Sequence, residues 1–313
     1  MRCSFAALLV VAALACSSHS ASPEPDPRAP PPSTPSSSVP LAAPSRPAPP
    51  YDLPFDIHLR TDLARLHLGD DALTDVEDNV FLFVALPYTS LSFGPTLALV
   101  RRALPALYNG RFSTRPTRPI TVYLFEYAGE YEAFCKARYG RPCPSPLGFY
   151  EGFAREIVAD QHYGVTTVLH ELVHPILEAD FPEAPRWLGE GISAMYEAPV
   201  IAGGEIHGGT GWRLPWLRRA LNARGHHELA SLDALFSMPA DVFQGPDALT
   251  AYAVARFACL WLDSPGQDRL WKFYGTWRDH FGEDPTGEKS FAAVVGQTPH
   301  EANDAWRKWV RTL

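Results

Sequence analysis

The segment HELVH, residues 170–174, contains the side chains of this chain whose types and spacing could do chemistry. His170 and His174 are four residues apart, so on a helix they project from one face about one turn apart. Two imidazoles so arranged can share one Zn²⁺ ion, and Glu171, rotated by about 100°, can reach a water held by the ion. Zinc lowers the pKa of such a water to about 7, so a carboxylate can take its proton while the oxygen attacks a carbonyl. The segment therefore predicts a hydrolytic metal site, and a histidine pair on a solvated helix face is the alternative.

A helix must carry these residues. Apolar side chains recur at helical spacing from Val165 to Leu177, at positions 165, 168, 169, 172, 173, 176 and 177. Pro175 complicates the helix, because proline removes one helical hydrogen bond and crowds the preceding turn. We expect a helix with one buried face and a local irregularity at Pro175.

A catalytic zinc ion usually has three protein ligands, so a carboxylate downstream should complete the site. The candidates are Glu178, Asp180, Glu183 and Glu190. Glu178 lies one further turn along the same helix, too far from the histidines unless the helix bends. Asp180 has the spacing from His170 of the third ligand in metzincin peptidases, but those enzymes turn the chain at a glycine where this sequence has Leu177.

Glu190 belongs to a different element. FPEAPRWLGEGISAMYEA indicates a turn followed by a second helix that starts near Pro185, a favoured residue of a first helical turn. Glu190 would then face the first helix. Four apolar residues of the second helix would pack inward: Trp187, Leu188, Ile192 and Met195.

HELVH, followed after fifteen residues by the glutamate of WLGEG, resembles the gluzincin zinc metallopeptidases, specifically the peptidase-MA-like group. The resemblance is strongest over residues 147–198, and a weaker likeness extends from NVFLFVAL to the terminal WRKWVRTL. It implies that His170, His174 and Glu190 bind one Zn²⁺ ion and that Glu171 is the general base. It also implies an α+β, zincin-like fold, in which a mixed β-sheet carries the active-site helix and a mainly helical C-terminal half follows. The implied function is a zinc-dependent peptidase acting on a peptide or protein substrate.

Residues outside the motif have open roles. Tyr252 could donate to the oxyanion of the transition state, or pack as an ordinary helix residue. Ser193 and Glu197 follow Glu190 by three and seven residues and could orient the ligands, and capping or solvated positions are the alternative.

The glycine-rich segment AGGEIHGGTGWRLPW suggests a mobile loop at the cleft. Trp212 or Trp216 would line the cleft there, or lie in the core. Three histidines without motif spacing are expected at the surface: His207, His226 and His227.

The elements before the motif predict a β-α-β beginning. NVFLFVAL (79–86) and PITVYLFE (119–126) are strand-like, and the helical pattern between them is broken at Pro105 and stopped by Gly110. EYEAFCKARYG predicts a helix, and GFYEG and REIVAD predict two short strands joined by a tight turn. REIVAD is the candidate edge strand for adding an extended substrate, unless it is a purely structural strand. After residue 200 the pattern is helical.

The N-terminus predicts export. A single Arg2 precedes an apolar run from Phe5 to Ala15 that is too short for a membrane span, so residues 1–15 are a predicted signal peptide. AALAC resembles a bacterial lipoprotein box with Cys16 as the lipidated residue, and Ser17 suggests sorting to the outer membrane. The protein would then touch the membrane only through this anchor; free secretion is the alternative. Residues 16–50, rich in Pro, Ser and Ala, are a predicted disordered linker.

Residues 51–313 remain for one domain, with an α/β part at 51–183 and a helical part at 184–313. The chain is 46% apolar and 12% aromatic, which is sufficient for a substantial core. Its net charge is −8 without a basic segment, so we expect no nucleic-acid partner. Cys135 and Cys143 should form a disulfide in an exported chain, and Cys259 should be a buried thiol.

A non-catalytic envelope binding or scaffold domain with a peptidase-like fold is the second function class. The complete ligand set and Glu171 favour catalysis, because a structural zinc site should be closed by a fourth protein ligand, and the sequence offers none.

Overall fold

Two runs in which every residue is buried form neighbouring parallel strands, β2 (Phe81–Ala85) and β3 (Ile120–Phe125). β5 (Glu156–Asp160) is also buried throughout and pairs in parallel with β3. Strands this apolar are typical of a sheet covered on both faces. β1 (Leu73–Glu77) and β4 (Gly148–Glu151) add antiparallel at the two edges, giving a mixed sheet of order β1-β2-β3-β5-β4.

The computed structural model describes residues 50–223, 229–264 and 268–313, and Asp52–Leu313 form one compact unit. The predicted signal peptide, Cys16, the linker up to residue 49, His226 and His227 lie outside the described residues. Among the helices that are described, none is long and apolar enough to cross a membrane.

Helices precede, interrupt and follow the sheet along the chain. Those of the sheet-bearing half are α1 (Leu53–Leu68), α2 (Ser90–Tyr108), α3 (Ala128–Tyr139) and α4 (Thr167–Asp180). Those of the C-terminal half are α5 (Arg186–Met195), α6 (Leu214–Asn222), α7 (Leu232–Phe236), α8 (Ala248–Leu262), α9 (Arg269–Asp279), α10 (Glu288–Val295) and α11 (Pro299–Val310). A hairpin of β6 (Pro199–Ala202) and β7 (Glu205–Gly208) lies between α5 and α6.

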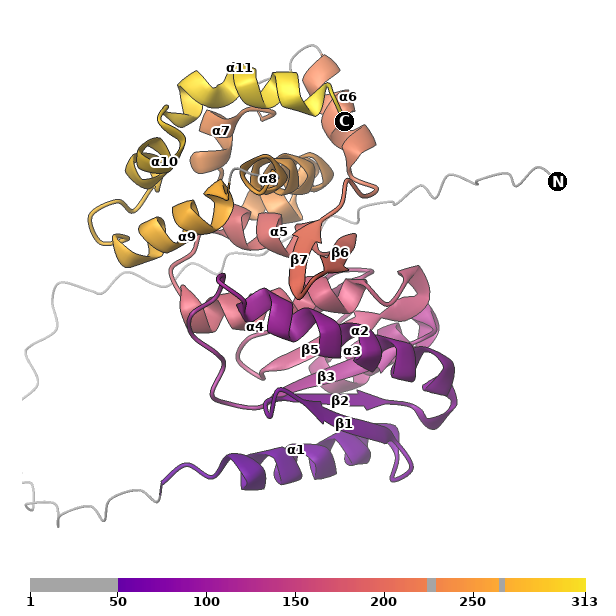
Figure 1. Cartoon of the computed structure of the whole chain (residues 1–313). Helices are drawn as coiled ribbons and strands as arrows, with labels where there is room; N and C mark the ends of the chain where they lie inside the picture. Colours follow the sequence, from indigo (N-terminus) through magenta and orange to yellow (C-terminus); the bar gives the residue numbers. More distant parts are fainter. Residues whose placement is uncertain (1–49, 224–228, 265–267) are drawn as a thin grey trace, which may run out of the picture. The chain divides into compact units, whose positions relative to one another are not determined.

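The sheet divides its helices between two faces (Figure 1). Leu82 and Val84 share an apolar cluster with residues of α1 and α3. Phe81 and Phe83, which alternate with them along β2, belong to the cluster that contains α2 and α4. This is the period of two expected of a strand with two covered faces.

The cluster on the α2 and α4 face continues into the helical half. It runs through α5 and α8 as far as Trp306 of α11. α8 is buried at nearly every position from Ala251 to Leu262 and lies among α5, α6, α7 and α9 (Figure 1). The predicted α+β class, with a mixed sheet and a mainly helical C-terminal half, is confirmed.

Prolines interrupt the helices less than the sequence suggested. The predicted break at Pro105 is wrong, since α2 runs unbroken through Pro95 and Pro105. α4 also continues through Pro175. A proline costs a helix one hydrogen bond, and burial of the apolar face of each helix outweighs that cost.

Two other predictions require correction. REIVAD is not an edge strand: β5 lies between β3 and β4, because GFYEG returns antiparallel along its outer side. The glycine-rich segment is not simply a loop, since Glu205–Gly208 pairs with Pro199–Ala202 before α6 begins. Ile206 is buried and ties the hairpin to the core.

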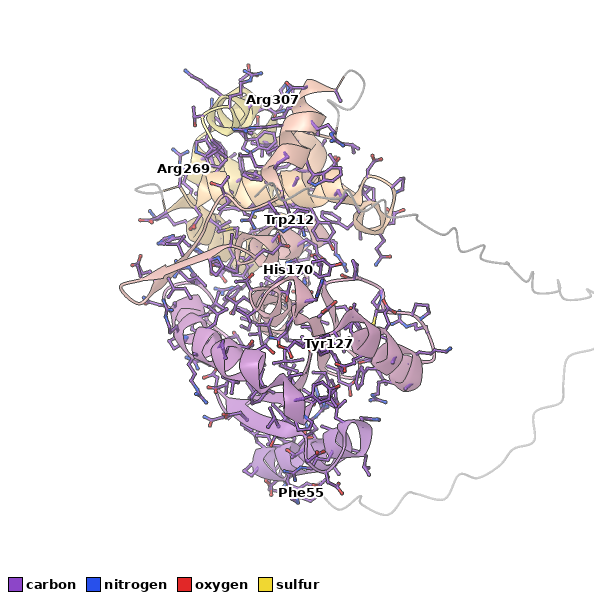
Figure 2. All side chains as sticks on the ribbon, turned by 90° about the vertical axis from the view of Figure 1, so that its right-hand side faces the viewer. Phe55, Tyr127, His170, Trp212, Arg269 and Arg307 are labelled. Atoms are coloured by element: carbon purple, nitrogen blue, oxygen red, sulfur yellow. A yellow bond between two sulfur atoms is a disulfide. The ribbon has the colours of Figure 1, made fainter. Side chains whose placement is uncertain are left out.

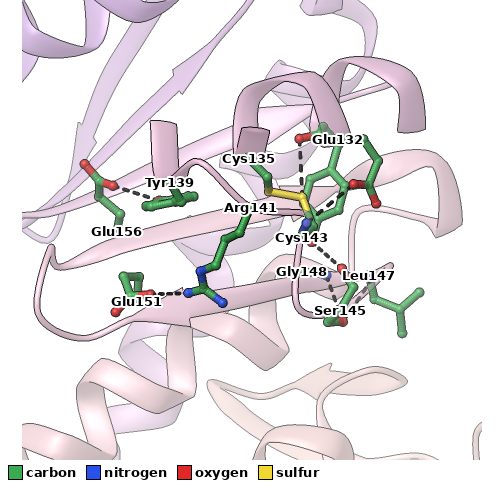
Figure 3. The surroundings of a disulfide bond; sticks show 11 residues. Glu132, Cys135, Tyr139, Arg141, Cys143, Ser145, Leu147, Gly148, Glu151 and Glu156 are labelled. Atoms are coloured by element: carbon green, nitrogen blue, oxygen red, sulfur yellow. Dashed lines mark hydrogen bonds and ion pairs between the residues drawn. A yellow bond between two sulfur atoms is a disulfide. The ribbon is translucent and has the colours of Figure 1, made fainter. Parts of the chain in front are cut away.

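A disulfide fixes the segment that leads into β4 (Figure 3). Cys135 of α3 is bonded to Cys143, with Cα atoms 5.3 Å apart, as predicted. The Tyr131 hydroxyl donates to the Ser145 carbonyl at 2.5 Å, and the Leu147 amide donates to Ser145 Oγ at 3.2 Å. The start of the edge strand is therefore held against α3. Cys259 is the buried free thiol that the sequence predicts.

Candidate metal centre

Two consecutive helices bring the motif residues together. His170 and His174 lie on α4, and Glu190 lies on α5 after the bend at residues 181–185. The glycines on either side of Glu190 permit close packing. A Cβ atom on Gly189 would lie 3.0 Å from Leu177 Cδ2 of α4, and one on Gly191 would lie 2.7 Å from Cys259 Sγ of α8. The WLGEG segment of α5 therefore packs closely between α4 and α8, and its glutamate points toward the histidines.

The three side chains converge on one point. Glu190 Oε2 lies 3.3 Å from His170 Nε2 and 3.8 Å from His174 Nε2. One ligand atom from each residue lies within 4.8 Å of the others. Ligand bonds of about 2.0–2.1 Å at tetrahedral angles would separate such atoms by roughly 3.3 Å. The spacing therefore suits a metal ion.

Hydrogen bonding at Glu190 gives an independent test of that fit. Its Oε1 accepts from Arg186 Nε at 2.8 Å. Its Oε2 is buried, makes no hydrogen bond of good geometry among the described residues, and faces the two imidazole nitrogens. An oxygen so placed is stabilised only by a proton or a cation between it and the imidazoles, and a shared metal ion would supply that charge. His170, His174 and Glu190 can thus hold a metal ion.

Glu171 stands beside this group. Its Oε2 lies 3.9 Å from His174 Nε2. A Cβ atom on Gly148 would lie 3.1 Å from Cγ and Oε1 of Glu171 and from the Val158 carbonyl oxygen, so the carboxylate packs closely against the start of β4. Burial raises the pKa of Glu171 to about 7.

Glu197 orients His170. Its Oε1 lies 3.2 Å from His170 Nδ1, and Arg213 binds both of its oxygens, at 2.6 Å through Nη2 and 2.9 Å through Nε. Burial would raise the pKa of Glu197, but His170 and Arg213 outweigh it and lower the pKa to about 2. A carboxylate that accepts from Nδ1–H leaves the Nε2 lone pair for a metal.

Aromatic rings hold Arg213 in place. The guanidinium carbon lies 4.3 Å from the ring centroid of Trp212 and 4.7 Å from that of Tyr252. Trp212 is 48% exposed, so it covers this network from the solvent side. Figure 2 shows Trp212 and His170 near the junction of the helical and sheet-bearing halves.

Tyr252 and Arg186 lie together next to the ligand group. The Tyr252 ring lies 6.4 Å from the His170 ring, and its hydroxyl interacts with the Arg186 guanidinium. Arg186 is the residue that the sequence analysis missed. Its position four residues before Glu190, at the start of α5, was the available signal.

Carboxylates on both sides of His170 set the charge of the site. Burial lowers the pKa of His170, but Glu190 and Glu197 outweigh burial and raise it to about 10. Burial lowers the pKa of His174 to about 4. Burial would raise the pKa of Glu190, but the two imidazoles outweigh it and lower the pKa to about 2. The surroundings thus favour one positive charge between the carboxylates, which a bound metal ion would supply on displacing the proton.

Asp180, the rival third ligand, lies elsewhere. Its Oδ1 accepts from Ser113 N, Ser113 Oγ and Thr114 N at 2.9, 2.8 and 2.6 Å. Its Oδ2 accepts from Tyr274 and Arg278 at 2.8 and 2.9 Å. Both oxygens are used in joining α4 to the segment 113–114 and to α9, so the metzincin arrangement does not occur.

The remaining candidates also lie outside the ligand group. Glu178 and Glu183 are exposed, and Met195 is in the core as predicted. Ser193 is buried, and its Oγ has no hydrogen-bond partner among the described residues. No contact therefore supports a role for Ser193 in orienting the ligands. His207 lies at the surface, 3.2 Å from both Glu205 and Asp263, and Trp216 packs partly buried against the core.

No protein-family model matches the chain, and a search of curated proteins gives no match. The interpretation of the site therefore depends on its residues and their geometry.

Proposed function

We propose that the chain is a zinc-dependent peptidase of the gluzincin type with a zincin-like fold. The observation that carries the proposal is the convergence of the buried Glu190 Oε2, which makes no hydrogen bond of good geometry, on two imidazole nitrogens at 3.3 and 3.8 Å. Two histidines and one carboxylate suit zinc, and three protein ligands are the number found in catalytic sites. A closed structural site would require a fourth.

The carboxylate of Glu171 is the proposed general base. A zinc ion in this site would polarise the scissile carbonyl and lower the pKa of a bound water. Glu171 lies beside the ligands, so it can take a proton from the attacking water and pass it to the leaving amine. Its position between His174 and Gly148 places that transfer next to the start of β4.

Tyr252 and Arg186 are the proposed donors to the carbonyl oxygen. Burial raises the pKa of Tyr252 above its ordinary value, so the hydroxyl keeps its proton and can donate. Arg186 contacts both the Tyr252 hydroxyl and Glu190, and it is charged throughout the pH range of proteins. Donors fixed in advance at the site of developing charge stabilise the transition state.

The free edge of β4 is the proposed binding place for an extended peptide. No described strand pairs with its outer side. Asp160 N donates to Leu147 O at 3.0 Å, so Leu147 and every second residue after it face β5. Gly148 and Tyr150 therefore direct their backbone groups outward. The Gly148 amide donates to Ser145 Oγ at 3.5 Å, so the Gly148 carbonyl and the backbone groups of Tyr150 are the proposed places for a substrate strand to pair.

Export to the cell envelope, with a lipid on Cys16, belongs to the same proposal. The support is the N-terminal sequence together with the disulfide between Cys135 and Cys143, because disulfides persist in oxidising compartments.

Substitution of Glu171 by Gln tests the function. We expect Glu171→Gln to keep its zinc and to lose at least about 100-fold in peptide cleavage, because general-base catalysis contributes roughly that factor or more. Glu183→Gln, an exposed carboxylate beyond the same helix, is the matched control. Metal analysis and hydrolysis of a randomised quenched-fluorescent peptide mixture give the two readouts. Equal turnover by Glu171→Gln would remove the general base and favour the scaffold interpretation.

A further inference from the structure

We propose that Arg256 of α8 is a positioning residue of the metal centre: it holds Glu197 against His170 and fixes the part of the chain that carries Arg213. This inference rests on the proposed zinc site. It adds a residue that acts through Glu197 and not by contact with the metal ion.

Arg256 is fully buried, and hydrogen bonds satisfy only part of its guanidinium. Its Nη2 donates to the Gly209 carbonyl oxygen at 2.6 Å. Its Nε and Nη1 are buried and have no hydrogen-bond partner among the described residues. The carboxylate that faces this group is Glu197, whose Oε2 lies 4.0 Å from Nη1. A buried charge is costly unless an opposite charge compensates it, so Arg256 and Glu197 stabilise each other.

Glu197 needs such partners because it lies outside a regular element. α5 ends at Met195, two residues earlier, so the hydrogen bonds of the helix do not continue past Glu197. Its Oε1 lies 3.2 Å from His170 Nδ1 and accepts from Arg213 Nη2. Its Oε2 accepts from Arg213 Nε and faces Arg256. Any rotation of the carboxylate away from His170 would therefore also move Oε2 relative to Arg256.

Arg256 also fixes the chain between β7 and α6. Gly209 begins this connection, and its carbonyl oxygen is the acceptor for Arg256 Nη2. At Gly211 the backbone has a φ of +66°, and a Cβ atom there would lie 2.6 Å from the same nitrogen. The connection therefore turns closely around the guanidinium before it reaches Arg213, which binds Glu197. One buried side chain thus fixes both Glu197 and the arginine that binds it.

The position of Arg256 along α8 agrees with this role. Tyr252 precedes it by four residues, so both side chains lie on one face of the helix. The Tyr252 ring lies 4.7 Å from the guanidinium carbon of Arg213 and 6.4 Å from the ring of His170. The same face of α8 therefore meets the metal centre at two places, with Tyr252 beside His170 and Arg256 beside Glu197.

Cobalt substitution tests the proposal, because the visible absorption of bound Co²⁺ depends on the geometry of its ligands and does not respond to a residue that only stabilises the fold. In the full chain, Arg256→Lys should shift that spectrum and weaken zinc binding about tenfold, because lysine cannot bind the Gly209 carbonyl and face Glu197 together. Competition with a chromophoric chelator measures the affinity.

Arg111→Lys is the matched control. Arg111 donates to the carbonyl oxygens of Ala106 and Ile206 at 3.0 and 2.7 Å, so it ties β7 to α2. Its replacement should lower the free energy of unfolding and leave the Co²⁺ spectrum and the zinc affinity unchanged. The same spectral shift in Arg111→Lys would show that any loosening of the hairpin has this effect, and it would overturn the specific role of Arg256.

A double-mutant cycle with Glu197→Gln separates positioning from packing. Arg256→Lys should weaken zinc binding about tenfold in the wild-type chain and less than about twofold in the Glu197→Gln chain, because it acts through that carboxylate. An equal loss in both chains, or a wild-type Co²⁺ spectrum for Arg256→Lys, would overturn the inference. Failure of the peptidase proposal alone would appear as cleavage that does not depend on Glu171, and a wild-type chain that binds neither ion would overturn the metal centre and this inference together.

Discussion

Asp180 and Glu190 are buried carboxylates at the two sides of one bend, and their surroundings differ completely. Every oxygen of Asp180 accepts hydrogen bonds, from the segment 113–114 and from α9. Glu190 uses Oε1 for Arg186 and leaves Oε2 facing two imidazoles. By their spacing along the chain, both residues were candidates for the third metal ligand, and their hydrogen bonds distinguish them.

The difference teaches how to distinguish a structural carboxylate from a ligand. A buried carboxylate with a full set of donors is stabilised by the protein alone. A buried oxygen aimed at the lone pairs of neighbouring nitrogens is stabilised only when a cation or a proton lies between them. Asp180 is thus a tie between elements, and Glu190 is the third ligand of the proposed zinc site.

The largest expected effect is on metal binding. Glu190→Gln should weaken zinc binding by more than about 100-fold, since even the outer partners of metal ligands contribute 10–100-fold. Asp180→Asn should bind zinc as wild type does, because its contacts lie elsewhere. Competition with a chromophoric chelator measures both affinities. Zinc loss in Asp180→Asn with retention in Glu190→Gln would reverse the assignment.

Arg213 tests the residues that orient His170, because it binds Glu197, the carboxylate next to His170 Nδ1. Arg213→Lys should lower zinc affinity by about 10–100-fold, because lysine cannot bind both oxygens of Glu197 or stack in the same way between Trp212 and Tyr252. Arg219→Lys, whose arginine stacks on Trp216 at the surface, is the matched control. If both lysine variants bind zinc equally well, Glu197 does not depend on Arg213 for its position.

Asp180 should matter for stability instead. Asp180→Asn puts an amide group among donors and should lower the free energy of unfolding by about 1–3 kcal/mol. Asp279→Asn, an exposed partner of the same Arg278, should change it by less than about 0.5 kcal/mol. Urea unfolding of the three chains measures the difference. Equal destabilisation by the two variants would show that the buried hydrogen bonds of Asp180 do not stabilise the fold more than a surface ion pair does.

The pH dependence of that difference follows from the pKa of Asp180. Burial would raise it, but hydrogen bonds from Ser113, Tyr274, Thr114 and Arg278 outweigh burial and hold the pKa below its ordinary 3.8. The stabilisation is therefore complete above the unfolded-state pKa and is lost as the pH falls through the lower folded-state value. The gap between wild type and Asp180→Asn should be constant near neutral pH and narrow below about pH 4. If the difference in the free energy of unfolding instead grew in acid, the folded-state pKa of Asp180 would lie above its unfolded-state value.

The smallest expected effect is on the rate of peptide cleavage, through the contact between Glu171 and the start of β4. Gly148→Ala should reduce peptide cleavage about tenfold without changing zinc affinity. The new Cβ atom would lie 3.1 Å from both Glu171 Oε1 and the Val158 carbonyl oxygen, and because the backbone of β5 yields less than a side chain, the carboxylate would be displaced slightly. Gly94→Ala, where a Cβ atom meets nothing within 4 Å, should leave cleavage unchanged. Unaltered cleavage by Gly148→Ala would show that the carboxylate tolerates the shift.

Much of the site was predictable because its residues are close in the chain. The four-residue spacing of the histidines fixes their common helix face, and Glu190 follows in the next helix, where the flanking glycines mark close packing. The central strands and the bond between Cys135 and Cys143 were equally local signals.

What the sequence could not predict depends on contacts between distant residues. Asp180 is saturated by Ser113 and Tyr274, which are 67 and 94 residues away. REIVAD and GFYEG form a pair of strands, and the one that does not pair with β3 becomes the edge of the sheet. Either strand carries enough apolar residues to be the buried one, so the sequence does not distinguish them. Arg186 acquires its role only when Tyr252 of α8 lies beside it.

The wedged position of α5 has a thermodynamic consequence. Two of the proposed ligands come from the helix on the sheet and one from the helix that begins the C-terminal half, so a bound ion would hold the two halves together across the bend. Binding only to the folded chain, zinc at about 1,000 times its dissociation constant would add roughly 4 kcal/mol to the free energy of unfolding. The same ion would then take part in catalysis and stabilise the folded chain. Removing it with a chelator would lower the stability of the contact between the two halves as well as stop turnover.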